Sequence, residues 1–68
     1  MDEYRIFFRI KDEDNVKIEK INNNHLKHLS FKYGSYASVH TWNFNSQKDA
    51  DEGKRIIQEN CPGARNKF

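Results

Sequence analysis

The sequence predicts an α+β fold, in which a four-stranded antiparallel sheet of ββββα meander order carries one C-terminal helix on one face. Apolar residues alternate with polar ones in the N-terminal part of the chain, which is typical of half-buried strands. An aromatic-rich stretch, 26–44, contains a glycine turn that divides it into two further strands. A capping residue and acidic side chains then predict a helix over residues 47–60.

The first predicted hairpin joins strands at about 4–11 and 16–21. Ile6, Phe8 and Ile10 share one face of the first strand, and the apolar residues of 16–21 are expected to pair with them. That pairing requires an odd number of residues in the acidic turn between the strands, because a shift of one residue moves every side chain to the other face.

The second predicted hairpin joins strands at about 26–33 and 36–44 through Gly34-Ser35, where glycine suits the positive φ of a type II′ turn. This register places the bulky side chains on one face, which we expect to form the core. The expected cross-strand pairs are Tyr33 with Tyr36, Phe31 with Ser38, Leu29 with His40 and Lys27 with Trp42.

The predicted helix begins after a cap at Asn45 or Ser46 and ends before Pro62. Its apolar stripe is thin and consists of small residues with Ile57, so that the helix can approach a sheet surface rich in aromatic rings. A short basic tail, 64–68, follows the helix.

Length and composition indicate a single small domain, 1–68, with charges that nearly balance at +2. The single cysteine excludes an intramolecular disulfide and favours a reducing compartment. No apolar run approaches the length of about 20 residues that crosses a bilayer, so we expect a cytoplasmic protein without a membrane partner. Asn and Lys each occur eight times, a bias typical of AT-rich coding in phages and mobile elements.

The residues that could support catalysis or metal binding form no recognisable pattern. His28 and His40 fall on opposite faces of the predicted hairpin, and the three glycines form no phosphate-binding loop. Cys61 lies near a helix C-terminus, where the helix dipole raises the pKa of a thiol. A raised pKa disfavours a nucleophilic role, so we expect Cys61 to be a buried packing residue. The sequence therefore predicts a protein that is not an enzyme and holds no metal or cofactor.

A single helix leaves the second face of the sheet open, and this face is the predicted partner-binding surface. Its candidate binding residues are Arg5, Phe7, Arg9, Lys17, Ile21, His28 and Lys32. Arginine and aromatic side chains are favoured anchors in protein interfaces, so the leading hypothesis is a protein-binding inhibitor or regulator of phage or mobile-element type. The alternative is a nucleic-acid-binding domain that uses the same basic face.

Two structural alternatives accompany this prediction. A homodimer could form through the strand at 4–11 if that strand lies at the edge of the sheet. If the helix instead covers the face of Ala37 and Val39, the binding surface becomes the opposite one, formed by Tyr33, Tyr36, His40 and Trp42.

Overall fold

The computed structural model describes residues 4–66, and it contains four strands and two α-helices in the order β-α-β-β-α-β. A 3₁₀ turn, η1, precedes the first helix, and a π-helical segment, η2, continues it. The elements are β1 (Tyr4–Arg9), η1 (Asp12–Asp14), α1 (Asn15–Lys20), η2 (Ile21–His25), β2 (Phe31–Tyr36), β3 (Val39–Phe44), α2 (Gln47–Asn60) and β4 (Arg65–Asn66).

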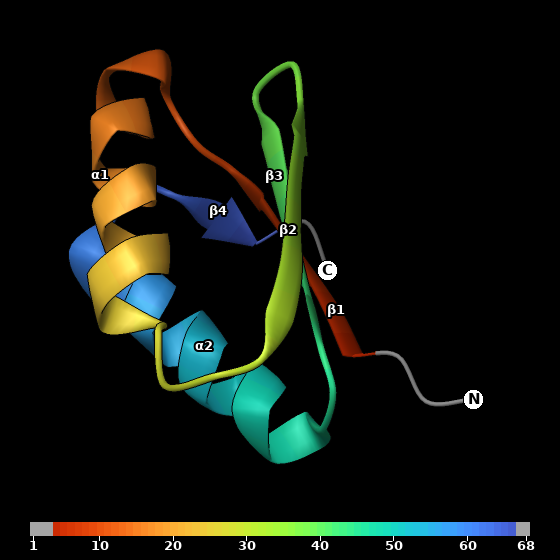
Figure 1. The fold of residues 1–68 in the computed structure, drawn as a ribbon. Coiled ribbons are helices and arrows are strands. Elements are labelled where there is room, and N and C mark those ends of the chain that lie inside the picture. The colour runs from red at the N-terminus through yellow and green to blue at the C-terminus, as the bar shows by residue number, and fades with distance from the viewer. Residues whose placement is uncertain (1–3, 67–68) are drawn as a thin grey trace.

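The strands form one antiparallel sheet in the order β2-β3-β1-β4, with both helices packed on the same face (Figure 1). Three strands of six residues make up most of the sheet, and the two-residue β4 pairs with Phe8 and Arg9 of β1. Because β1 and β2 both run antiparallel to β3, they are parallel to each other and need the crossover that α1 provides. This topology is the ferredoxin-like, or split βαβ, arrangement.

The predicted strand at 16–21 is wrong, and with it the ββββα meander, because this segment is helical. Val16 and Ile18 suggested alternation, yet Val16 is 79% exposed. The buried residues are Ile18 and Ile21, which are three positions apart, as residues on one face of a helix are. The acidic turn that precedes them provides the negative charge that a helix N-terminus favours.

The second hairpin exists, but its turn lies at Ala37-Ser38 instead of Gly34-Ser35. Ala37 has a φ of 56°, a left-handed conformation that costs a non-glycine residue roughly 1–2 kcal/mol. The observed register compensates for this cost, because Tyr33 lies opposite Trp42 and Phe31 opposite Phe44. Both pairs face the helices, so Phe31, Trp42 and Phe44 lie in or against the core as predicted, whereas Tyr33 is 39% exposed and Tyr36 moves to the opposite face.

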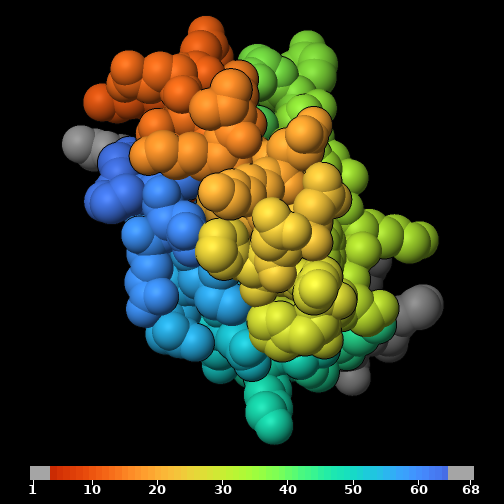
Figure 2. Space-filling view, turned by 60° about the vertical axis from the view of Figure 1, so that its left-hand side comes forward, coloured from red at the N-terminus to blue at the C-terminus, as the bar shows by residue number. Residues whose placement is uncertain are grey.

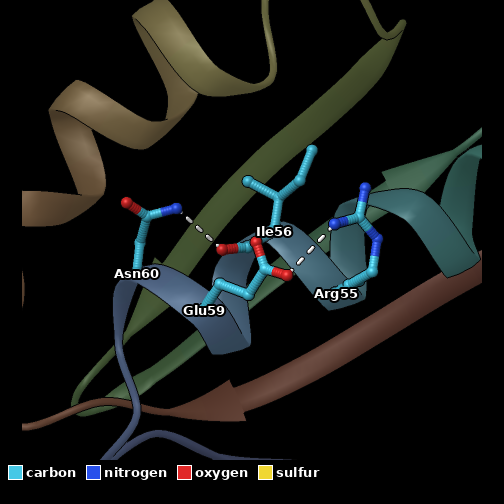
Figure 3. Close-up of polar contacts among 4 residues, drawn as sticks. All are labelled: Arg55, Ile56, Glu59 and Asn60. Atoms are coloured by element: carbon cyan, nitrogen blue, oxygen red, sulfur yellow. Dashed lines mark hydrogen bonds and ion pairs between the residues drawn. The ribbon is translucent and has the colours of Figure 1, made fainter.

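The helix over 47–60 is confirmed with the predicted bounds. The Ser46 hydroxyl caps it by accepting a hydrogen bond from the Asp49 N–H at 3.2 Å. At the other end, the Asn60 side-chain amide donates to the Ile56 carbonyl, and Arg55 pairs with Glu59 at 3.1 Å (Figure 3). These contacts are all local to α2, so they stabilise the helix itself, whereas its place on the sheet depends on the packing of its buried side chains.

The core lies between the sheet and the two helices. The sheet contributes Phe8, Trp42 and Phe44, each at most 2% exposed, and α2 contributes the predicted stripe of small residues with Ile57. The complete set of buried apolar side chains is Phe8, Ile10, Ile18, Ile21, Leu26, Trp42, Phe44, Ala50, Ile57 and Cys61. One face of the sheet is therefore closed by helices.

Candidate functional site

The other face of the sheet, which we name the open sheet face, is not covered by either helix in the described part of the chain (Figure 1). Successive strand residues point to opposite faces, so the neighbours of the buried positions belong to it. It consists of three cross-strand rows of three residues, namely Arg5, Asn43 and Lys32, then Phe7, Thr41 and Gly34, then Arg9, Val39 and Tyr36.

The charges on the open sheet face all have one sign. Arg5, Arg9 and Lys32 are basic, and none of the nine residues is acidic. Within residues 4–66, every carboxylate side chain lies instead on η1, α1 or α2, among lysines and one arginine. The fold therefore separates a basic sheet face from a helical layer of mixed charge, which the overall charge of +2 does not reveal.

Two aromatic rings accompany these cations. Phe7 lies in the middle of β1 and is half-buried, with the Arg5 guanidinium carbon 6.0 Å from its ring centroid. Tyr36 ends β2 and is 87% exposed, which is high for so large an apolar ring. Val39 lies between Tyr36 and Arg9 in the same cross-strand row. The face thus offers planar apolar surface next to positive charge.

Four of the seven predicted binding residues share this face, namely Arg5, Phe7, Arg9 and Lys32. The other three were placed by the incorrect strand at 16–21 and by the predicted strand at 26–33, which begins only at Phe31, and they lie elsewhere.

Lys17 is on α1, 3.5 Å from Asp14, and Ile21 is a core residue with 1% exposure. His28 lies in the turn before β2, where its Nε2 is 2.6 Å from Glu52 Oε2 and its hydrogen bond lowers the pKa of that carboxyl.

The sequence interpretation missed Tyr36, because it placed this residue after the turn. Continued alternation through Phe31, Tyr33 and Ser35 was the signal that could have assigned Tyr36 to the opposite face. The alternative surface of Tyr33, Tyr36, His40 and Trp42 does not exist as such, since His40 and Trp42 are buried beneath the helices.

The edge strand predicted for a homodimer is also misplaced. β1 lies inside the sheet between β3 and β4, and among the described strands the long outer edge belongs to β2. A dimer through residues 4–11 would have to displace β4 from Phe8 and Arg9.

A polar and aromatic cluster lies on the helix-facing side of the hairpin. Tyr33 Oη and His40 Nδ1 are 2.6 Å apart, and the Trp42 Nε1–H donates to Asn22 Oδ1 at 2.7 Å. The rings of Tyr33 and Trp42 are 5.2 Å apart between centroids. Burial lowers the pKa of His40 and raises the pKa of Tyr33, so both side chains are neutral at pH 7.

The buried His40 makes the stability of the fold depend on pH. Its pKa is lower in the folded chain than the ordinary value of 6.5, so the unfolded chain binds the proton more readily. We expect the stabilisation to be complete above pH 6.5 and to decline as the pH falls from there towards the folded pKa, with a slope of at most about 1.4 kcal/mol per pH unit. Urea unfolding measured between neutral and mildly acidic pH checks this.

The matched variant for this experiment is His40→Asn, which keeps a polar partner for Tyr33 and does not titrate. Its unfolding free energy should vary less with pH over the same range, since all other residues are the same in both proteins. An equally steep profile in the variant would assign the pH dependence to other groups.

Cys61 is buried at the end of α2 with 0% exposure. Burial, and after it the negative charge of Asp14, raise the pKa of its thiol. A neutral buried thiol packs as a small apolar side chain, as predicted.

Between residues 4 and 66, no group of three histidine, cysteine or acidic side chains is arranged to hold a metal ion. None of the described helices is long and apolar enough to cross a membrane.

Comparisons of the chain with protein-family models, with curated proteins and with solved structures give no match. The fold and the chemistry of the two faces therefore provide the basis for a functional proposal.

Proposed function

We propose that this protein is a non-enzymatic binding protein whose open sheet face contacts single-stranded nucleic acid. The observation that carries this proposal is the surface charge: Arg5 and Arg9 flank Phe7 along β1, Lys32 lies across the face on β2, and none of the nine residues is acidic, although residues 4–66 include eight acidic side chains. A polyanion is the partner that such a face attracts.

The roles of the side chains follow from their chemistry. Arg9 and Lys32 lie at opposite corners of the face and would neutralise phosphates, while the rings of Phe7 and Tyr36 would stack on bases. Unpaired bases are the better partners, because a ring that stands on a sheet reaches the flat face of a base only where the base is unstacked from its own strand. Thr41 lies opposite Phe7, and because its hydroxyl donates to the Gly34 carbonyl at 3.3 Å, its oxygen remains as an acceptor.

The affinity for single-stranded oligonucleotides should depend on the salt concentration, on the charge of Arg9 and on the ring of Tyr36. With the two phosphate contacts of Arg9 and Lys32, log K is expected to fall with log salt concentration with a slope of about −1.4. We expect Arg9→Glu to weaken binding about tenfold or more, and Tyr36→Ala to weaken it by about 1–3 kcal/mol through the lost stacking. Fluorescence anisotropy of labelled oligonucleotides measures the two variants at about 50 mM salt and the slope over a series of higher salt concentrations.

Lys48→Glu is the matched control, since it makes the same charge change on an exposed helical residue away from the open sheet face. Its affinity should stay within about twofold of the parent. A titration without binding to any single strand, or equal losses for Arg9→Glu and Lys48→Glu, would contradict the proposal.

A protein partner is the second candidate, and the exposure of Tyr36 favours it. Tyrosine and arginine are frequent anchors of protein interfaces, and here Tyr36, Val39 and Arg9 form one cross-strand row. Affinity capture from lysate with and without nuclease separates the two candidates. A protein that is retained after nuclease treatment, and is lost with both Arg9→Glu and Tyr36→Ala, would assign the face to a protein.

A further inference from the structure

A groove of about 370 Å³ lies on the other side of the sheet from the open sheet face, between α1 with η2 and the β2–β3 hairpin. In Figure 2, the orange residues of α1 and the green residues of the hairpin lie next to each other at the top of the molecule, and the groove is lined from both segments. The lining residues that matter for its chemistry are Glu19, Asn22, Asn23, Tyr33, Ser35 and His40.

A buried imidazole nitrogen distinguishes this groove from an ordinary surface depression. His40 is 5% exposed, and its Nε2 has no hydrogen-bond partner within the described chain. Buried polar groups in folded proteins are almost always hydrogen-bonded, and an unsatisfied one destabilises the fold. A ligand that reaches into the groove and pairs with Nε2 would remove this defect.

The Tyr33 hydroxyl leaves Nε2 as the ring nitrogen of His40 that is available to a ligand. Tyr33 Oη is 2.6 Å from His40 Nδ1, so Nδ1 already has its hydrogen-bond partner. In the neutral imidazole, the nitrogen that carries the proton is a donor and the other nitrogen is an acceptor. The groove therefore offers a buried ring nitrogen that requires a hydrogen-bonding partner from the ligand.

The opposite wall of the groove is built by a π-helical segment, a distortion that is frequent at functional sites. Asn22 is held there by the bond that its Oδ1 accepts from Trp42, which leaves its amide N–H₂ as a positioned donor. Asn23 lies beside it with both an acceptor and donors, and the Glu19 carboxylate adds an acceptor.

These groups select the ligand by charge and shape. Of the described residues that line the groove, Glu19 is the only charged one, so an anion is disfavoured. The Tyr33 ring, which is 39% exposed, provides a flat apolar side, and the amides provide alternating donors and acceptors. An uncharged planar heterocycle with hydrogen-bonding groups along its edge matches this combination, and a groove of this volume accommodates a molecule of nucleoside size.

We propose that the groove between η2 and the β2–β3 hairpin is a binding site for a neutral nucleobase, in which His40, Asn22 and Asn23 read the edge of the base and Tyr33 packs on its face. The base could come from a free nucleoside or from a nucleic-acid strand. The site does not depend on the open sheet face, since it lies on the opposite side of the sheet.

The test is an NMR titration of the ¹⁵N-labelled full chain with adenosine, guanosine, cytidine and uridine in turn. We expect at least one nucleoside to produce saturable shifts at Asn22, Asn23 and Ser35 and in the His40 ring, with a dissociation constant of about 1 mM or below. Ribose and inorganic phosphate serve as probes of the remaining parts of a nucleotide, and neither should shift these signals.

Two neighbouring asparagines provide a matched pair. Asn23 and Asn24 are both exposed and both lie on η2, but only Asn23 lines the groove. Asn23→Ala should weaken nucleoside binding about fivefold, as expected for a lost hydrogen bond, whereas Asn24→Ala should leave it unchanged. The two substitutions are made at adjacent positions of the same exposed segment, so we expect them to affect folding equally.

Arg9→Glu separates this site from the proposed function. If the nucleoside site is real, its affinity for the free nucleoside should be the same in this variant, even where oligonucleotide binding is lost. Nucleoside binding that disappears with Arg9→Glu would show that bases bind only on the open sheet face. Absence of saturable shifts up to about 5 mM, or equal affinities of Asn23→Ala and Asn24→Ala, would overturn the proposal.

Discussion

Replacement of Gly53 by alanine is expected to destabilise the fold by about 1–2 kcal/mol, although the same change stabilises most helices. A β-carbon at this position would lie 2.3 Å from the Cζ of Phe44, whose ring is 2% exposed and held in the core. Overpacking costs about 1–3 kcal/mol, and so close an approach to a buried ring places this change in the upper part of that range, about 2–3 kcal/mol, of which the better helix propensity of alanine offsets about 1 kcal/mol. Since a core in a domain below about 70 residues rarely supplies more than 3–5 kcal/mol, the loss should be large.

Gly63 provides the matched control, because a β-carbon there meets no atom within 4 Å and its backbone does not have a positive φ. Gly63→Ala should be neutral or slightly stabilising, since it restricts the unfolded chain. Urea unfolding followed by Trp42 fluorescence measures both variants. Equal stability of Gly53→Ala and the parent would mean that α2 does not approach β3 as closely as the structure shows.

Replacement of Trp42 by phenylalanine is expected to cost about 2–3 kcal/mol. The indole is 0% exposed and lies between Phe8 and Tyr33, so a smaller ring leaves a cavity. The variant also removes the Nε1–H donor and leaves Asn22 Oδ1 without its partner, which adds about 1 kcal/mol. Far-UV circular dichroism is the suitable probe, because Trp42 is the only tryptophan of the chain.

A double-mutant cycle with Asn22→Ala isolates the hydrogen bond from the packing. Asn22→Ala alone leaves the buried indole N–H unsatisfied and should destabilise the parent, but it should cost about 1 kcal/mol less in the Trp42→Phe background. Additive effects would indicate that η2 is not anchored to the sheet through this bond, and would also weaken the proposed nucleobase site that depends on it.

Local patterns in the sequence were sufficient for the elements whose signals lie within a few residues. The helix over 47–60 has its cap at Ser46 and its stripe from Ala50 to Cys61 in one continuous segment, so propensity, capping and burial all agree. Arg5, Phe7 and Arg9 were likewise assigned to one exposed face, because alternation along β1 is unambiguous once Phe8 and Ile10 are taken as core.

The groove could not be predicted in the same way. Its walls come from η2 and from the β2–β3 hairpin, which are brought together only by the crossover of α1. Asn22 and Asn23 belong to a run of three asparagines, and nothing in their own neighbourhood indicates that one of them accepts a hydrogen bond from Trp42, 20 positions away. The basic residues of the open sheet face come from different strands, so their separation from the acidic residues of the helices likewise becomes apparent only when the order of the strands is known.

The sequence by itself therefore determined the α+β class, the C-terminal helix, the aromatic core and the basic face of β1. Tertiary structure decided the conformation of 16–21, the register of the hairpin and the position of Tyr36. The physical reason is that short apolar segments satisfy both helical and strand spacing, so the choice depends on which arrangement buries more surface. In the hairpin, the pairing of β2 with β3 places Phe31 opposite Phe44 and Tyr33 opposite Trp42 on the face of the core, and that gain outweighs the local preference for a glycine turn.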